Sequence, residues 1–332
     1  MSIDQAGLRR RRRRLIRTAV GVALSILLIT GAGACAGPLS GTPATVAPTT
    51  PTQTATGPAP SPPATDRPQE EATEQPPRAA KRGPLGAPGE WELSWRDEFS
   101  GRTLDLDRWR PNWLANSDKA VTKPINDAER ACYDPANVKV RGGTLRLTVK
   151  DRECRTHDGR TYEYASGLVE SAHDHRLTYG YVESRIYLPP SDGTQAPAGS
   201  CGPNWAVFWL NGAQHPQDGE IDIMECLSRN DVAWHYHWGT KTSPETASGY
   251  PEAWRGDMPG SGGWHTFGVD WSPGRLVFYY DGVPVGTQTE GVTDTPHYVV
   301  AGLAVSGSAV ATPQTLQIDY VRVWKRAKPS SS

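Results

Sequence analysis

From Trp91 onward, apolar and polar residues alternate along much of the chain, and no segment shows a convincing helical period. The clearest runs cover residues 181–188, 276–280, 298–305 and 316–324, and they are rich in β-branched and aromatic residues. Strict alternation is typical of strands with one buried face. Turn-forming pairs such as Pro273-Gly274 and Asp281-Gly282 lie beside these runs. The pattern therefore predicts an all-β sandwich or barrel of short strands.

The first 90 residues have a different composition. They contain none of the aromatic residues, and residues 37–89 hold 13 of the 29 prolines. A segment with so little apolar surface to bury is not expected to fold alone. We therefore divide the chain into an N-terminal segment over 1–34, a Pro/Thr/Ala-rich linker over 35–90, a folded domain over 91–326 and a short tail over 327–332.

The N-terminal segment has the order of residues found in an export signal. Six consecutive arginines at 9–14 precede an apolar run over 19–30 and the small residues 31–34. A membrane-spanning helix would need about 20 apolar residues, so a permanent anchor is the weaker interpretation. The arginines also resemble a twin-arginine signal, and Cys35 could carry a lipid. We expect an exported bacterial protein, extracellular or at the cell surface, with membrane contact only through a lipid anchor at Cys35.

Charge and cysteine content narrow the class of protein further. The formal net charge of −1 excludes a globally basic chain that binds nucleic acid, and we expect a monomer. Four cysteines lie in the predicted domain, an even number that favours two disulfides outside the cytoplasm. Three pairings are open, and short sequence separations favour Cys132–Cys154 and Cys201–Cys226.

The most informative stretch is residues 220–225, which read Glu-Ile-Asp-Ile-Met-Glu. Side chains alternate on a regular strand, so Glu220 and Asp222 share one face and Glu225 falls on the other. A β-bulge near residues 223–224 would insert one extra residue and return Glu225 to the acidic face. The sequence therefore predicts three carboxyl groups on one side of a kinked strand.

Three carboxylates on one face repel each other, which costs stability unless the protein uses them. A solvated polar face and a calcium site are the alternatives, but calcium favours flexible loops with backbone carbonyl ligands. Glycoside hydrolysis needs two carboxyl groups in different roles, one attacking the sugar and one donating a proton. The cluster therefore predicts a glycosidase.

The run E-I-D-I-M-E resembles the active-site signature of glycoside hydrolase family 16 in its laminarinase-like form. Residues 95–101, 205–210 and 319–324 resemble the family's opening, W-P-A-F-W-L and closing strands, in the same order. The resemblance implies a jelly-roll sandwich of two antiparallel sheets with a substrate cleft on the concave face. It also implies endo-acting, retaining cleavage of β-glucans or galactans. On this basis Glu220 is the nucleophile, Asp222 the assisting acid and Glu225 the acid/base. Nothing in the sequence requires a cofactor.

Further residues near the cluster are candidates for binding the sugar chain. Trp205 and Trp209 share a face, and the expected hairpin places Trp205 close to Glu225; stacking on sugar rings is the functional interpretation and core packing the alternative. His237 matches a family histidine beside the carboxylates, with metal binding as the weaker alternative. We expect the neighbouring His235 to be incidental.

Five other residues are weaker candidates. Arg185 resembles a cleft arginine of the family, although a surface charge is an equal alternative. Asn126 and Glu129 resemble a segment near the sugar subsites. Glu98 and Asp319 are candidate ligands for a structural calcium.

The substrate is less well defined than the chemistry, because the segment around Asn126 matches the family imperfectly. We expect a polysaccharide partner, first of all β-1,3-glucan, with mixed-linkage glucan and galactans open. A non-catalytic β-glucan-binding protein and a transglycosylase are the alternative functions. The presence of both glutamates of the motif favours an enzyme.

Overall fold

A computed structural model describes residues 83–188, 204–214, 217–228, 231–240, 242–249, 263–307 and 310–328. All of them belong to one compact unit, Glu74–Ser332. The predicted export signal, Cys35, most of the predicted linker, Cys201 and the end of the tail lie outside the described residues. Within the described ranges, no helix is long and apolar enough to cross a membrane.

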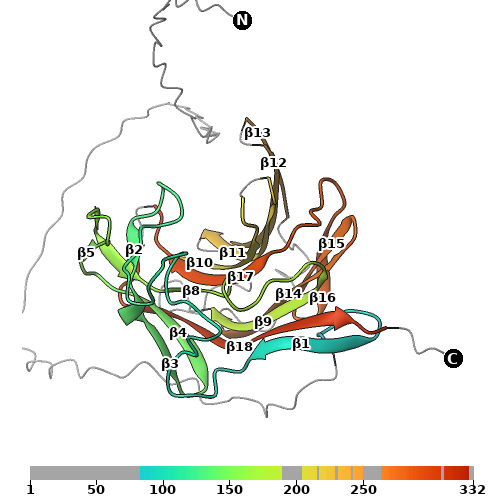
Figure 1. Ribbon diagram of the computed structural model, residues 1–332, viewed down its shortest axis with the longest axis horizontal. Coiled ribbons are helices and arrows are strands. Elements are labelled where there is room, and N and C mark those ends of the chain that lie inside the picture. The colour runs from blue at the N-terminus through green and yellow to red at the C-terminus, as the bar shows by residue number, and fades with distance from the viewer. Residues whose placement is uncertain are drawn as a thin grey trace, which may run out of the picture. The chain divides into compact units, whose positions relative to one another are not determined.

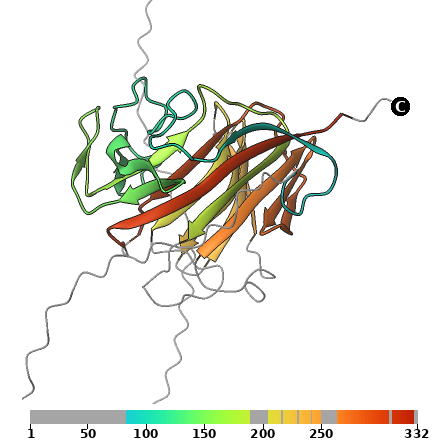
Figure 2. The same ribbon diagram turned by 90° about the horizontal axis from the view of Figure 1, so that it is seen from below.

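Two antiparallel sheets face each other as a sandwich (Figures 1 and 2). The eight-stranded sheet has the order β16-β15-β14-β9-β18-β4-β3, and β1 pairs with β18. Its strands are β1 (Trp91–Asp97), β3 (Val138–Arg141), β4 (Thr144–Val149), β9 (Gly180–Leu188), β14 (Gly263–Ser272), β15 (Arg275–Tyr280), β16 (Val283–Gln288) and β18 (Gln314–Arg326).

The six-stranded sheet has the order β13-β12-β11-β10-β17-β8. Its strands are β8 (Leu168–Glu170), β10 (Trp205–Asn211), β11 (Glu220–Ser228), β12 (Asp231–Thr240), β13 (Ser243–Gly249) and β17 (Tyr298–Ala304). Two small pairs complete the fold: β2 (Ala131–Tyr133) with β7 (Tyr164–Ser166), and β5 (Cys154–Arg155) with β6 (Thr161–Tyr162). A single 3₁₀ turn, η1 (Pro135–Asn137), follows β2. The predicted all-β fold and its four alternating runs are confirmed.

The core lies between the two sheets and is formed by side chains at alternating positions of the strands. In β9, Val182 and Ile186 point into the core, and Phe208 of β10 reaches it from the other sheet. Trp234 of β12 stacks on Phe278 of β15 with ring centroids 4.5 Å apart, so these two rings join the layers directly. Each large apolar side chain buried here stabilises the fold by roughly 1.5–3 kcal/mol. The core thus fixes both sheets and leaves their outer faces for other contacts.

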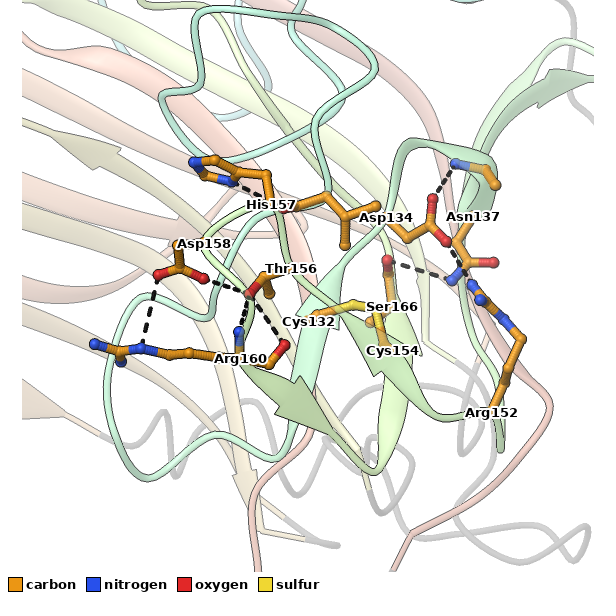
Figure 3. Close-up of a disulfide and its surroundings, with 12 residues drawn as sticks. Cys132, Asp134, Asn137, Arg152, Cys154, Thr156, His157, Asp158, Arg160 and Ser166 are labelled. Atoms are coloured by element: carbon orange, nitrogen blue, oxygen red, sulfur yellow. Dashed lines mark hydrogen bonds and ion pairs between the residues drawn. A yellow bond between two sulfur atoms is a disulfide. The ribbon is translucent and has the colours of Figure 1, made fainter.

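A disulfide between Cys132 and Cys154 ties β2 to β5, with the two Cα atoms 6.1 Å apart (Figure 3). Asp134 lies beside it, accepts a hydrogen bond from the backbone N–H of Ala136 at the start of η1, and forms an ion pair with Arg152. The prediction for Cys132–Cys154 is confirmed. Cys226 is also disulfide-bonded.

The boundary predicted at Trp91 is wrong, because residues 83–90 are part of the fold. The backbone N–H of Leu85 donates to Glu183 Oε2 at 2.8 Å, and Ala87 packs on the aromatic cluster that contains Trp91 and Tyr181. The prediction failed because it rested on composition. Residues 83–90 are rich in Pro and Gly and contain no aromatic side chain, but they pack on residues of the eight-stranded sheet.

Candidate active site

A pocket opens on the face of the six-stranded sheet that points away from the core. It is lined by Ile125, Asn126, Glu129, Tyr133, Trp205, Val207, Trp209, Glu220, Asp222, Glu225 and Ala304. Seven of the nine residues predicted from sequence to bind or cleave a sugar are therefore among its walls, and His237 and Arg185 are not.

The predicted bulge is present in β11. Against β10, Val207 pairs with Glu225 while Trp209 pairs with Asp222, so the three steps from Asp222 to Glu225 face only two steps of β10. The pairing with β12 shifts at the same place. The extra residue lets Ile223 and Met224 both enter the core, where they are fully buried. Glu225 consequently returns to the face that carries the other two acids.

The three carboxyl groups are crowded and poorly solvated. Asp222 is 4% exposed and Glu225 8% exposed. Burial, and then the charge of Glu225, raise the pKa of Asp222 well above its usual value. Burial and the charge of Asp222 likewise raise the pKa of Glu220, while His237 acts in the opposite direction. The cluster therefore favours shared protons over three full charges.

The predicted tryptophans lie beside these acids. Trp205 donates a hydrogen bond from Nε1 to Glu225 Oε1 at 3.1 Å, which confirms the expected proximity. Trp209 pairs with Asp222 across the strands and packs on Tyr298 and Val300 of β17. Both residues line the pocket, but only Trp205 is half-buried, whereas Trp209 is 4% exposed and packs into the sheet, as the alternative interpretation expects.

Both histidines of β12 contact the cluster, and the expectation that His235 is incidental is wrong. His237 Nε2 lies 3.3 Å from Asp222 Oδ2, and its Nδ1 lies 2.8 Å from the hydroxyl of Thr246 on β13. His235 is 8% exposed, and its Nδ1 lies 2.5 Å from Glu225 Oε2. The two residues are two positions apart on one strand, and that spacing was the sequence signal that could have identified His235.

The loop before β2 brings Asn126 and Glu129 to the pocket. Glu129 accepts hydrogen bonds from the backbone N–H groups of Ile125 and Asn126, both at 3.1 Å, and from the hydroxyl of Tyr133 at 2.5 Å. Burial raises the pKa of Glu129 despite these donors. Because both of its oxygens have protein partners, Glu129 holds the loop in place, and Asn126 is the more exposed of the two at the rim.

Arg185 does not belong to this site, so the prediction of a cleft arginine is wrong. It lies on β9 of the eight-stranded sheet, and its position alternates with core-facing Val182, Ile186 and Leu188, which directs it to the outer face. There it forms an ion pair with Asp319 at 3.2 Å and lies 4.7 Å from the ring centroid of Trp264.

The two candidate calcium ligands already have cationic partners. Glu98 accepts two hydrogen bonds from Arg322, each at 2.8 Å, and Asp319 pairs with Arg185. These two carboxylates, as arranged, do not fit a shared calcium ion.

In the part of the chain that the structure describes, the side chains close enough to share a metal ion are the three pocket acids and the two neighbouring histidines of β12. They form two groups whose ligand atoms lie within 4.8 Å of one another: Glu220, Asp222 and His237, and Asp222, Glu225 and His235. Within these groups, His237 already contacts Asp222 and His235 already contacts Glu225.

A jelly-roll sandwich that holds a carboxylate cluster between tryptophans on one sheet has the fold and the acid groups of a glycoside hydrolase. Comparison with known families agrees with this class. The chain belongs to the glycosyl hydrolases family 16, which matches residues 126–322, more than half of its length.

Individual relatives are distant. The chain is 28% identical to glucan endo-1,3-beta-glucosidase A1 of Niallia circulans over 70% of its own length and 38% of the relative's. It is 26% identical to the endo-1,3-1,4-beta-glycanase ExsH of Rhizobium meliloti, covering 72% of the chain and 48% of the relative. It therefore spans less than half of either protein. Among solved structures, an endo-beta-1,3-glucanase from Pyrococcus furiosus aligns with a TM-score of 0.58 and 25% identity, over 72% of this chain and 96% of that one.

Proposed function

We propose that the chain is an exported, endo-acting glycoside hydrolase that cleaves β-1,3-glucan by double displacement. The observation that carries the proposal is the bulge in β11, which places Glu220, Asp222 and Glu225 on one face of the pocket. Two relatives named for action on β-1,3-linked glucan or glycan support the choice of substrate. The predicted signal at residues 1–34 supports export, because a polysaccharide substrate is met outside the cell.

In this proposal Glu220 attacks the anomeric carbon while Glu225 donates its proton to the leaving glycosidic oxygen. The bond to the leaving sugar breaks and a covalent glycosyl-enzyme forms on Glu220. Glu225 then removes a proton from water, which attacks the same carbon and releases Glu220. Two inversions at one carbon retain the anomeric configuration.

The neighbouring groups have roles that follow from their contacts. Trp205 and His235 hold the two oxygens of Glu225, so its carboxyl plane is fixed for proton transfer. Asp222, with its raised pKa, can keep a proton at low cost and donate a hydrogen bond to Glu220. His237 beside Asp222 favours the ionised form of Glu220, which the attack requires.

The test is release of reducing ends from laminarin, mixed-linkage glucan, cellulose oligosaccharides and agar-type galactans. We expect turnover on laminarin with wild-type protein and a loss of at least a thousandfold for Glu220→Gln, because the nucleophile is removed. Glu92→Gln is the matched control, since Glu92 is an exposed glutamate on β1 that pairs with Lys325. Proton NMR of the first product from the β-linked substrate should show the β-anomer.

Each outcome discriminates between functions. Binding of laminarin without turnover on any glycan would identify a non-catalytic glucan-binding protein. Products longer than the starting oligosaccharide as the main outcome would identify a transglycosylase. An α-anomer as first product would overturn the double displacement.

A further inference from the structure

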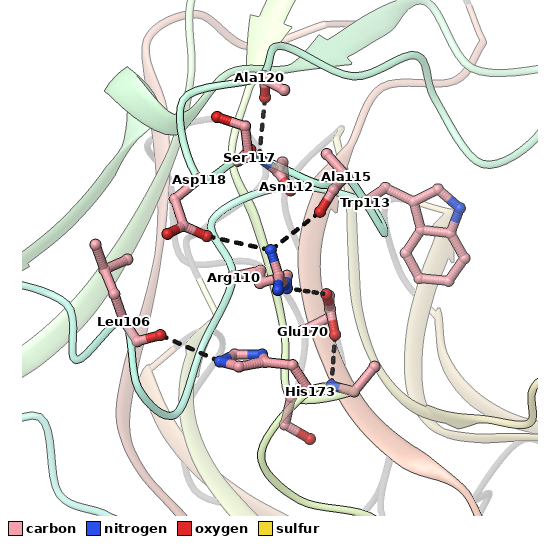
Figure 4. A network of polar contacts seen from close by, with 12 residues as sticks. Leu106, Arg110, Asn112, Trp113, Ala115, Ser117, Asp118, Ala120, Glu170 and His173 are labelled. Atoms are coloured by element: carbon pink, nitrogen blue, oxygen red, sulfur yellow. Dashed lines mark hydrogen bonds and ion pairs between the residues drawn. The ribbon is translucent and has the colours of Figure 1, made fainter.

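A hydrogen-bonded loop over residues 110–122, here called the Trp113 loop, lies beside the six-stranded sheet. Its first residue, Arg110, exchanges backbone hydrogen bonds with Glu170 of β8, at 2.9 and 3.0 Å. The Arg110 side chain donates to the carbonyl of Ala115 at 3.1 Å and pairs with Asp118 at 3.5 Å (Figure 4). The base of the loop is therefore attached to the edge strand of the sheet that carries the pocket.

The interior of the Trp113 loop is equally well fixed. Asn112 is fully buried, and its amide donates to the carbonyls of Ser117 at 2.8 Å and Ala120 at 3.0 Å. The backbone N–H of Trp113 donates to the hydroxyl of Thr122 at 3.1 Å. These hydrogen bonds pair polar groups in the interior of the turn. None of them uses the indole of Trp113, which points away from the network in Figure 4.

The indole lies against the aromatic face of the sheet. Its centroid is 6.0 Å from that of Trp209 and 6.2 Å from that of Tyr298, and it is half-buried. The next residue, Leu114, has a φ of 48°, a left-handed conformation that is strained for a residue with a Cβ. Leu114 is also 50% exposed, so core burial does not repay that strain. This strained residue directly follows Trp113, the residue that contacts the sheet.

The position of Trp113 continues the pocket along the sheet. Trp209 faces Asp222 between β10 and β11, and Tyr298 lies one strand further, on β17. With strands about 4.8 Å apart, Trp113, which contacts residues of β10 and β17, is displaced from β11 by about one to two strand spacings, or roughly 5–10 Å. Trp205 and Trp209 lie beside Glu225 and Asp222 on β10, and Trp113 contacts Trp209 on the side toward β17.

We propose that Trp113 forms an additional sugar-stacking subsite beyond Trp209, so that the protein grips glucan chains longer than the pocket alone can hold. This inference rests on the proposed function. A half-buried indole that lies against Trp209 and Tyr298 at its buried side is suited to contact the apolar face of a pyranose ring with its exposed part. Fixing the ring in advance by the hydrogen-bonded loop lowers the entropy cost of binding.

The test is isothermal titration of laminari-oligosaccharides, from two to six sugars, into the full chain carrying Glu220→Gln, which prevents turnover. Adding Trp113→Ala should raise the Kd of the hexasaccharide about tenfold, the effect of leaving roughly 50 Å² of apolar surface unburied. The Kd of the shortest oligosaccharide that binds should change by less than twofold. Trp113→Phe should restore most of the affinity, because it keeps a flat ring.

A matched control is Trp264→Ala, which removes another half-buried tryptophan, from the outer face of the eight-stranded sheet. It should leave every Kd unchanged. Equal weakening at all chain lengths would show that Trp113 only supports the fold, and no weakening at any length would show that sugar does not reach it; either result overturns the subsite. If the Glu220→Gln parent binds no β-glucan or galactan at all, the proposed function fails as well.

Discussion

Neutralising Asp222 should make the protein more stable and less active at the same time. Asp222→Asn keeps the shape of the side chain but removes one negative charge from a group whose carboxyl atoms lie within 4.8 Å of Glu225. At an effective dielectric constant near 20, two full charges at that separation repel by about 3.5 kcal/mol. Shared protons relieve part of this repulsion, and the variant also weakens the contact with His237. We therefore expect a net gain of about 1–2 kcal/mol at pH 7.

The gain should depend on pH in a defined direction. Burial and Glu225 raise the pKa of Asp222 in the folded state above its usual value of 3.8. The folded protein therefore binds this proton more tightly than the unfolded chain does, and wild-type stability falls as the pH rises through the raised pKa. Below about pH 4 the carboxyl is protonated in both states. The advantage of Asp222→Asn should accordingly be present at pH 7 and absent near pH 3.5.

Thermal unfolding followed by circular dichroism at pH 3.5, 5.5 and 7 measures this difference. For a domain of this size, about 1–2 kcal/mol corresponds to a rise in Tm of roughly 2–8 °C. Asp134→Asn is the control of opposite sign, because Asp134 caps η1 and pairs with Arg152, so its charge is stabilising. An Asp222→Asn variant with an unchanged or lower Tm at pH 7, or with the same gain at pH 3.5, would refute the electrostatic reasoning.

Three shorter predictions test other parts of the structure. His235→Gln should lower kcat ten- to a hundredfold with KM within twofold, because a contact to the ionisable Glu225 is lost; an unchanged kcat would return His235 to an incidental role. Dialysis against EDTA should leave Tm unchanged, since Arg322 occupies both oxygens of Glu98, and a drop in Tm that calcium reverses would contradict this. Leu85→Pro should lower Tm by several degrees and Leu85→Ala by less, because only proline removes the N–H that reaches buried Glu183; equal losses would argue against that hydrogen bond.

Much of the fold could be predicted because the strands are marked by patterns within short stretches of the sequence. The alternation over residues 181–188 became β9, and that over 316–324 became part of β18, since a strand with one buried face must alternate. The bulge in β11 was also predictable, because three acids and their apolar neighbours can be sorted onto two faces only if one extra residue is inserted.

The errors have a common physical origin in contacts between distant segments. Arg185 has the right sequence neighbours for a cleft residue, but its sheet and its face depend on β9 pairing with β14 and β18. Residues 83–90 look like linker because their partners, such as Glu183, lie about a hundred positions further along. Trp113 gave no signal at all, because nothing in its own segment shows that it meets Trp209.

The two faces of β11 explain how a repulsive cluster can persist in a stable fold. Ile223 and Met224 both enter the core at the bulge, so the kink buries one more apolar side chain than a regular strand would. That extra burial, roughly 1.5–3 kcal/mol, is comparable to the repulsion between two of the carboxylates. The same inserted residue therefore creates the crowded acidic face and supplies the packing that offsets it. Any change that regularises the strand would remove both effects together, which ties the chemistry of the pocket to the core behind it.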